Sequence, residues 1–147
     1  MTLPDHIARP ARVEDCKWIY GFVCELEQCD FDYPVFKELF IRNISDINNV
    51  YLVAEKEGAV SGYVSCHGQY LLHHGGLVFE IQELYVKEEF RNKGLGQFLI
   101  QKLESALSQF DYRSLEVTAN KKREKTHDFY VKMGFELTHF KFTKAKE

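Results

Sequence analysis

The sequence predicts an α/β (α+β) domain in which a mixed β-sheet is flanked by helices. Two observations carry this prediction: apolar residues recur with helical spacing early in the chain, and strand-like and helix-like segments alternate in its second half. Because parallel strands need a crossover connection between them, this alternation implies some parallel pairing. The 147 residues, 45% of them apolar, suit one domain that spans positions 1–147.

Two helices are predicted before the first strand. Between Asp15 and Gln28, apolar residues recur every three or four positions and form one stripe: Trp18, Ile19, Phe22, Val23 and Leu26. Pro34 suits the first turn of a second helix, for which Asp32 is a candidate cap.

Three strands follow, at Val50–Glu55, Val60–Leu72 and Leu77–Val86. Gly58 marks the first turn between them, and His73-His74-Gly75-Gly76 interrupts the pattern at the second. Alternate residues of a regular strand point to opposite faces. We therefore expect Leu77, Phe79, Ile81 and Tyr85 to share one face of the third strand, and Glu80 and Glu83 to point to opposite faces.

The second half continues as helix, strand, helix and strand. The helix predicted from Leu95 to Gln109 carries an apolar stripe, and a short strand is expected at Leu115–Ala119. A second helix is expected from Thr126 to Met133, where Gly134 is well placed to end it. The last predicted strand is Phe135–Thr143.

Composition excludes several function classes. The net charge of -3 argues against a nucleic-acid partner, which favours a strongly basic face. We expect no secretory signal, because Asp5, His6 and Arg9 interrupt the start of the chain, and no membrane span, because no apolar stretch approaches the roughly 20 residues that one needs. The four cysteines form no C-x-x-C pair, so we expect reduced thiols in a cytoplasmic protein.

A glycine loop lies between the third predicted strand and the following helix: Arg91-Asn92-Lys93-Gly94-Leu95-Gly96. Free N–H groups at a helix start attract anions, and glycine permits close backbone approach to a phosphate. On its own the loop is equally well read as a plain strand-to-helix turn. It matches neither the P-loop, which needs Gly-Lys-Ser/Thr, nor the dinucleotide fingerprint, which needs a third glycine.

Two sequence blocks together resemble the GCN5-related N-acetyltransferases (GNAT). The first is Arg91-x-x-Gly94-x-Gly96 after Glu83-Leu84-Tyr85-Val86; the second is Asn120 followed by Phe129-Tyr130-x-x-x-Gly134-Phe135. The resemblance implies a mixed, mostly antiparallel sheet that splits into a V, with acetyl-CoA in the split. It also implies which residues contact the cofactor: Leu84, Tyr85, Val86, Arg91, Asn92, Lys93, Gly94, Leu95, Gly96, Gln97, Asn120 and Tyr130.

Acetyl transfer to an amine needs a neutral amine, a stabilised carbonyl oxygen and a proton for the departing thiolate. The resemblance makes Tyr130 the candidate acid, although a tyrosine in this helix is also a plausible core residue. Glu80 and Glu83 are candidate bases, either directly or through water, and a sheet-face ion pair is the alternative for Glu83. Asn120 is expected near the pantetheine arm or the sulfur, or bonded to its own loop.

The acceptor is suggested by a narrower resemblance, to the aminoalkylphosphonate N-acetyltransferases. It rests on Leu72-His73-His74, Glu80-Ile81-Gln82-Glu83-Leu84 and His139-Phe140-Lys141-Phe142-Thr143-Lys144, with shorter segments near the N-terminus. It implies a small aminophosphonate acceptor and a divalent cation. His73, His74 and Glu80 are a candidate metal set if the two strands form a hairpin; a solvated histidine turn is the alternative.

A basic cluster is another way to hold a phosphonate, and its candidates are Lys122, Arg123, Lys141 and Lys144. The rival functions are transfer to an aminoglycoside, a polyamine or a protein N-terminus, and a non-catalytic acyl-CoA-binding module. The aromatic segment Phe135–Thr143 is expected either to pair with a second subunit in a homodimer or to join the core.

Overall fold

A computed structural model describes residues 5–147. Its strands and α-helices follow in the order β1 (His6–Pro10), α1 (Cys16–Glu27), α2 (Tyr33–Ile44), β2 (Asn49–Lys56), β3 (Ala59–Leu71), β4 (Gly76–Val86), α3 (Leu95–Leu107), β5 (Tyr112–Val117) and α4 (Glu124–Lys132). Short 3₁₀ turns lie at Val13–Asp15, Leu72–His74 and Glu88–Phe90. Within the described residues, no helix is long and apolar enough to cross a bilayer.

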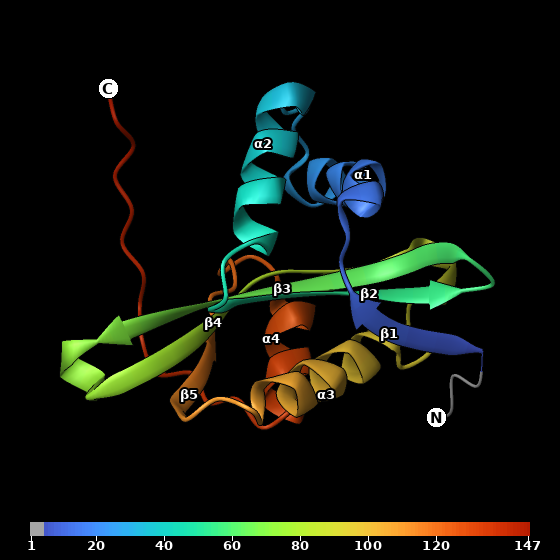
Figure 1. Ribbon diagram of the computed structural model, residues 1–147. Coiled ribbons are helices and arrows are strands. Elements are labelled where there is room, and N and C mark those ends of the chain that lie inside the picture. Colours follow the sequence, from blue (N-terminus) through green and yellow to red (C-terminus); the bar gives the residue numbers. More distant parts are fainter. Residues whose placement is uncertain (1–4) are drawn as a thin grey trace.

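The described strands form one five-stranded sheet in the order β1-β2-β3-β4-β5. The first four pair antiparallel, and β4 pairs parallel with β5 through the α3 crossover. Figure 1 shows α1 and α2 on one face of the sheet and α3 and α4 on the other. The predicted mixed, mostly antiparallel sheet flanked by helices is confirmed.

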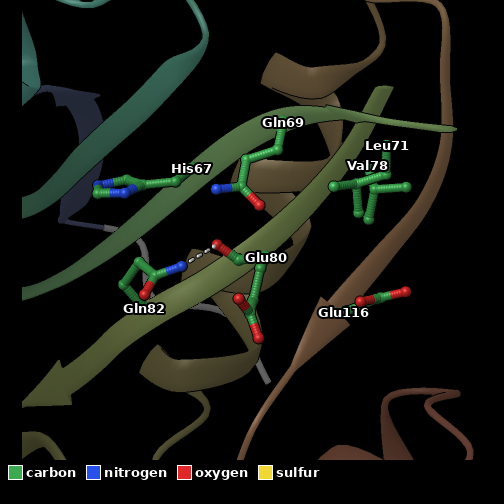
Figure 2. Close-up of a pocket in the computed structure, with 7 residues that line it drawn as sticks. All are labelled: His67, Gln69, Leu71, Val78, Glu80, Gln82 and Glu116. Carbon is green, nitrogen blue, oxygen red and sulfur yellow. Dashed lines mark hydrogen bonds between the residues drawn. The ribbon is translucent and has the colours of Figure 1, made fainter. Parts of the chain in front are cut away.

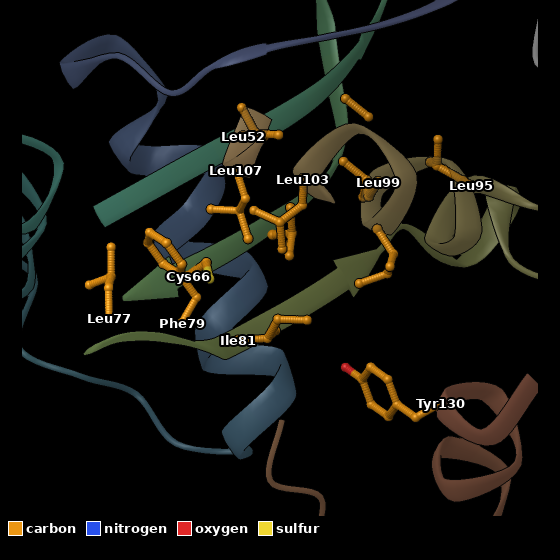
Figure 3. Close-up of a cluster of buried hydrophobic side chains, with 13 residues drawn as sticks. Leu52, Cys66, Leu77, Phe79, Ile81, Leu95, Leu99, Leu103, Leu107 and Tyr130 are labelled. Atoms are coloured by element: carbon orange, nitrogen blue, oxygen red, sulfur yellow. The ribbon is translucent and has the colours of Figure 1, made fainter. Parts of the chain in front are cut away.

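Each face of the sheet has its own apolar core. On the α3 face, the stripe of Leu95, Leu99 and Leu103 packs against Phe79 and Ile81 of β4 (Figure 3). On the other face, α1 and α2 bury a second cluster against β2, β3 and β4: Cys16, Ile19, Phe22, Val23, Phe40, Val53, Val60, Tyr63 and Tyr85. Removing this apolar surface from water is the main force that holds the helices on the sheet.

The sheet splits between β4 and β5. Their ladder joins Leu77–Ile81 of β4 to Tyr112–Val117 of β5 and ends there. Among the described residues, the stretch of β4 from Gln82 to Val86 therefore has a strand neighbour only on its β3 side. Its free backbone edge is where an extended ligand can add to the sheet.

A β-bulge reverses the predicted faces at the end of β4. Ser65 pairs with Glu83 but Cys66 pairs with Ile81, so Gln82 is an extra residue in β4. Beyond it, Leu84 packs on the α3 core and Tyr85 on the α1 core. The expectation that Tyr85 shares a face with Leu77, Phe79 and Ile81 is therefore wrong, because strict alternation does not survive an extra residue.

Two further predictions need correction. The strand β1 was missed, because five residues that include a proline and two charged or polar side chains give a weak alternation. The strand predicted at Phe135–Thr143 does not form within the described residues: no ladder or backbone hydrogen bond joins residues 136–147 to the rest of the chain. A strand needs a neighbouring edge, and this segment runs away from the sheet (Figure 1).

Candidate active site

The glycine loop joins the free end of β4 to the N-terminus of α3. Asn92 has φ 60° and Gly94, at the helix cap, has φ 87°, so the backbone turns sharply here. The chain then enters a 13-residue helix whose first N–H groups have no intrahelical partner. This arrangement suits an anion such as a pyrophosphate, and the loop contains the predicted cofactor residues from Arg91 to Gln97.

Gly96 also has a packing role. A Cβ atom at this position would lie 3.4 Å from the ring of Phe129, so the start of α3 and the helix α4 approach closely at the glycine. The same residue thus links the loop to the helix that carries Tyr130. The sequence predicted Gly96 as part of the cofactor loop, but it did not predict this contact between the two helices.

The side chain of Arg91 folds back over the end of β4. Its Nε donates to the carbonyl of Val86 at 2.8 Å, and its guanidinium lies 5.4 Å from the centre of the Tyr85 ring. The guanidinium also lies 3.4 Å from the carboxylate of Glu25 on α1, which accepts a hydrogen bond from the Tyr85 hydroxyl. Sequence reasoning missed Glu25, because its partners lie 60 and 66 positions further along the chain.

Tyr130 lies on α4, on the α3 face of the sheet. It is 8% exposed and packs edge-on against Phe129 and Phe135. Figure 3 shows its hydroxyl pointing from α4 toward β4 near Ile81, beside the split. Burial raises the pKa of Tyr130 to about 12, so the hydroxyl keeps its proton at neutral pH. The ring belongs to the core, as one of the two alternatives expected, and the role of Tyr130 as the acid stays a prediction.

Asn120 bonds within its own loop. Its side-chain oxygen accepts from the backbone N–H of Lys122 at 2.9 Å. Its backbone carbonyl lies 2.7 Å from Nε2 of His127, which fixes the loop against α4. This is the loop-bonding alternative considered for the residue, and its contact with the cofactor stays a prediction.

A polar pocket of about 210 Å³ opens on the α1 face, next to the bulge (Figure 2). Its lining residues come from β3, β4 and β5: His67, Gln69, Leu71, Val78, Glu80, Gln82 and Glu116. Glu80 lies opposite Glu116 in the β4–β5 ladder and opposite His67 in the β3–β4 ladder. Two carboxylates thus face the cavity, and its lining includes no lysine or arginine from the described part of the chain.

His67 is a site residue that sequence reasoning missed. Its Nε2 lies 2.7 Å from the hydroxyl of Tyr51, which also accepts from the amide of Asn43. Burial lowers the pKa of His67 and outweighs the nearby carboxylates, which act to raise it. The imidazole is therefore neutral at neutral pH. A single histidine inside an apolar strand gave no pattern from which to predict it.

The bulge brings Glu83 to the same face as Glu80. The carboxylate of Glu83 accepts hydrogen bonds from the hydroxyls of Tyr63 and Ser65, two neighbours on β3. Burial and the adjacent carboxylate raise the pKa of Tyr63 well above its usual value, so its hydroxyl remains a donor. Glu80 instead accepts from the hydroxyl of Thr118 at 3.1 Å. The expectation that the two glutamates point to opposite faces is wrong.

The proposed metal set does not assemble. The rings of His73 and His74 meet edge-on in the hairpin turn, with their centres 4.5 Å apart, whereas Glu80 pairs across the strands with His67. His74 instead lies 3.9 Å from Glu116. Residues 5–147 contain no group of three His, Cys, Asp or Glu side chains placed to hold a metal ion. The hairpin forms as expected, but its register separates the two histidines from Glu80.

The basic residues predicted to form a cluster come from two segments, the loop after β5 and the C-terminal segment. Arg123 donates to the carbonyl of Leu26 at the end of α1, and Lys122 is exposed in the loop after β5. Lys141 and Lys144 lie in the exposed C-terminal segment. None of the four lines the pocket.

Comparison with known proteins identifies the family. The family model of the acetyltransferase (GNAT) family matches residues 20–135. An aminoalkylphosphonate N-acetyltransferase of Salmonella typhimurium is 37% identical over 137 residues, which cover 93% of this chain and 89% of that protein.

Solved structures of the same fold include two N-acetyltransferases. An aminoglycoside 6'-N-acetyltransferase of Acinetobacter baumannii superposes with a TM-score of 0.82 at 18% identity, covering 97% of this chain and 98% of its own. A glucosamine-6-phosphate N-acetyltransferase of Arabidopsis thaliana superposes with a TM-score of 0.77 at 20% identity, covering 97% of this chain and 99% of its own. With the split sheet, the loop and the family match together, this chain belongs to the GNAT family, the acyltransferases that take their acetyl group from acetyl-CoA.

Proposed function

We propose that this enzyme transfers the acetyl group of acetyl-CoA directly to the primary amine of a small aminoalkylphosphonate. The observation that carries the proposal is the pocket of about 210 Å³ beside the split, whose size suits a small acceptor and whose two carboxylates suit its ammonium group. The 37% identity to an aminoalkylphosphonate N-acetyltransferase over nearly the whole chain supports the acceptor class.

The cofactor is proposed to enter between β4 and β5. Its pyrophosphate lies at the glycine loop, and its pantetheine arm pairs with the free backbone of Leu84, Tyr85 and Val86. Arg91 holds the end of β4 by its bond to the Val86 carbonyl, and it adds positive charge beside the pyrophosphate. The thioester then lies at the bulge, level with the pocket.

We assign the base to Glu83. It stands at the bulge, between the free edge of β4 and the pocket, and Tyr63 and Ser65 fix its carboxylate. Glu80 and Glu116 attract the ammonium form of the acceptor, and Glu83 takes its proton. The neutral amine then attacks the thioester carbon, and a tetrahedral intermediate forms with a new C–N bond.

The attacking nitrogen, now positively charged, loses one proton to water, and collapse of the intermediate then breaks the C–S bond and releases the thiolate of coenzyme A. We assign Tyr130 as the acid that protonates it, because its hydroxyl faces the split from the opposite side of the sheet. The mechanism needs no acetylated cysteine. Cys66 lies in the core, and burial raises the pKa of its thiol to about 12, which makes it unreactive at neutral pH.

The described histidines and carboxylates do not form a metal site, so no step is assigned to a divalent cation. All four cysteines are free, which fits the proposed location in the cytoplasm, where thiols stay reduced.

The test is a panel of acceptors assayed by release of the coenzyme A thiol. Aminoalkylphosphonates should release thiol and form N-acetylated product, in the presence or absence of a chelator. Release only with an aminoglycoside, a polyamine or a peptide would overturn the acceptor class. Absence of release with every amine, despite binding of acetyl-CoA, would instead favour a non-catalytic binding module.

A further inference from the structure

The hydrogen bonds around His67 fix which of its ring nitrogens carries the proton. The side-chain amide of Asn43 donates to the hydroxyl of Tyr51 at 3.1 Å, and that hydroxyl lies 2.7 Å from Nε2 of His67. Within residues 5–147 the Tyr51 hydroxyl has no other partner, so its own proton can go only to Nε2. Because burial lowers the pKa of His67, the imidazole is neutral and carries its single proton on Nδ1.

Nδ1 of His67 is therefore a hydrogen-bond donor that the protein itself does not use. The described residues offer it no partner, yet it is not sealed in the core, because the one fully buried side-chain nitrogen or oxygen without a partner among them is Nε2 of His6. His67 lines the polar pocket, so its free N–H opens on that pocket. An accessible donor without a partner in the protein is available to a ligand.

Charge divides the polar pocket across the sheet. Its two carboxylates, Glu80 and Glu116, come from β4 and β5, whereas β3 contributes the neutral polar side chains of His67 and Gln69. Figure 2 shows the His67 ring on the side of the pocket away from Glu116. The β4–β5 side adjoins the split, where the amine meets the thioester, so the other end of the acceptor extends toward β3.

We propose that His67 is a specificity-determining residue whose Nδ1–H donates to a phosphonate oxygen of the acceptor, and that Tyr51 is a positioning residue that fixes the tautomer. This inference rests on the proposed function, because it takes the acceptor to be an aminoalkylphosphonate. With the amine held at Glu80 and Glu83, a linker of two carbons spans about one strand spacing, roughly 5 Å, and brings the phosphonate over β3. A neutral donor keeps its hydrogen bond for the phosphonate, whereas a cation here would pair with the adjacent carboxylates.

The first test reads the tautomer of His67 without any acceptor. Long-range proton–nitrogen correlation spectra of isotope-labelled protein distinguish a protonated ring nitrogen from an unprotonated one by chemical shift, and the His67→Gln variant assigns the signals. In the wild type at neutral pH, Nδ1 should be protonated and Nε2 unprotonated, and Tyr51→Phe should lose this preference. A wild-type His67 with its proton on Nε2, or with protons on both nitrogens, would overturn the inference.

The same spectra test the contact with the acceptor in the wild-type protein. Addition of 2-aminoethylphosphonate should move the Nδ1 resonance of His67, and addition of propylamine, which has no phosphonate, should not. This measurement needs no variant, so it holds even if a substitution at His67 prevents folding. Equal shifts with the two amines, or no shift with either at saturation, would overturn the inference.

The second test exchanges His67 for two amides that each keep one of its nitrogens. Counted along the side chain, the amide of asparagine stands where Nδ1 stood, and the amide of glutamine stands where Nε2 stood. His67→Asn therefore keeps a donor toward the phosphonate, whereas His67→Gln keeps only the partner of Tyr51. The readout is kcat/KM for 2-aminoethylphosphonate divided by kcat/KM for propylamine.

The glutamine variant should lower this ratio about 10- to 100-fold, the effect of losing one hydrogen bond to a charged group, and the asparagine variant should keep most of the preference. Tyr51→Phe should raise the KM for the phosphonate and leave kcat nearly unchanged, because the bond is made equally in the ground state and the transition state. Equal ratios in the two His67 variants would overturn the inference, since the preference would then not depend on a donor at the Nδ1 position.

The wild-type ratio separates this inference from the proposed function. If the wild type does not prefer 2-aminoethylphosphonate to propylamine, the proposed function fails, and the role of His67 in specificity fails with it. If the wild type prefers the phosphonate and His67→Gln keeps that preference, only this inference fails and the proposed function stands.

Discussion

Glu83 and Tyr130 lie on opposite faces of the sheet, at the level where β4 and β5 separate. Glu83 is bonded to Tyr63 and Ser65 on the α1 face, whereas Tyr130 is buried among the residues of the α3 face. The β4–β5 ladder ends at Ile81, so the split connects the two faces at this point. A thioester placed in the split has a carboxylate on one side and a phenol on the other, which is the arrangement that acetyl transfer requires.

The Glu83→Gln variant should turn over about 100- to 1,000-fold more slowly, since a positioned base typically contributes that much. Its KM for acetyl-CoA should change little, because the carboxylate is bonded to Tyr63 and Ser65 on the α1 face and does not belong to the glycine loop. The loss should narrow as the pH rises, because more of the amine is then already neutral. A pH–rate profile of both forms measures this. Glu80→Gln is the matched control, and an equal loss of kcat there would reassign the base.

The Tyr130→Phe variant should lose about 100-fold in kcat with nearly unchanged affinity for acetyl-CoA. The wild-type rate should show no decline from tyrosine ionisation below about pH 10, because burial raises the pKa of Tyr130 to about 12 and the phenol stays protonated. Steady-state kinetics would test both points. Tyr112→Phe removes a hydroxyl from the same core and should be silent; a comparable loss there would indicate a packing effect.

The Arg91→Ala variant should raise the KM for acetyl-CoA about 10-fold, since one charge-assisted contact to a phosphate is worth roughly 1–2 kcal/mol. Glu25→Gln should have a smaller effect, because its contact with Arg91 is largely exposed and screened by solvent. Initial-rate kinetics with acetyl-CoA varied would measure both. If Arg91→Ala binds acetyl-CoA as the wild type does, the placement of the pyrophosphate beside Arg91 is wrong.

The elements that carry this site were predictable from the sequence, and the wrong predictions about its side chains share one cause. The glycine loop, the strand before it and the helix with Tyr130 are local patterns, and each formed where it was predicted. Strand register is not local. The extra residue Gln82 moves Glu83 and Tyr85 to the other face, and the hairpin register pairs Glu80 with His67 and not with His73 or His74.

The prediction of a strand at Phe135–Thr143 was wrong for a related reason. Its alternation of Phe140, Lys141 and Phe142 is that of a strand, but a strand forms only against an edge, and the sequence does not say which edge is available. His67 and Glu25 were missed because their partners lie 16 to 66 positions away.

The Asp15→Asn variant should lower the free energy of unfolding by about 2–4 kcal/mol, because it removes one of the two carboxylates, Asp15 and Glu55, that pair with the guanidinium of Arg9. Asp15 is 4% exposed and accepts two hydrogen bonds from Arg9 at 2.8 Å and one from the N–H of Arg12. Burial raises the pKa of Asp15, but these bonds outweigh it and lower the pKa below 3.8.

The lowered pKa of Asp15 makes its contribution to stability depend on pH. A carboxyl whose pKa is lowered on folding stabilises the protein above its unfolded pKa, and that contribution is lost as the pH falls through the folded value. Denaturant unfolding of wild type and Asp15→Asn should therefore differ most near neutral pH and converge below about pH 4. If the unfolding free energies of wild type and Asp15→Asn differ by the same amount from neutral pH to below about pH 4, the ion pair of Asp15 with Arg9 is not the source of the difference.

The central claim is that the acceptor is an aminoalkylphosphonate, and one matched pair of amines tests this claim. The measurement is kcat/KM for 2-aminoethylphosphonate against that for propylamine, an amine of similar length without the phosphonate. Recognition of the phosphonate by the enzyme should give the phosphonate at least about a 100-fold advantage, equivalent to roughly 3 kcal/mol of differential binding. Equal values for the two amines, or a preference for propylamine, would contradict it.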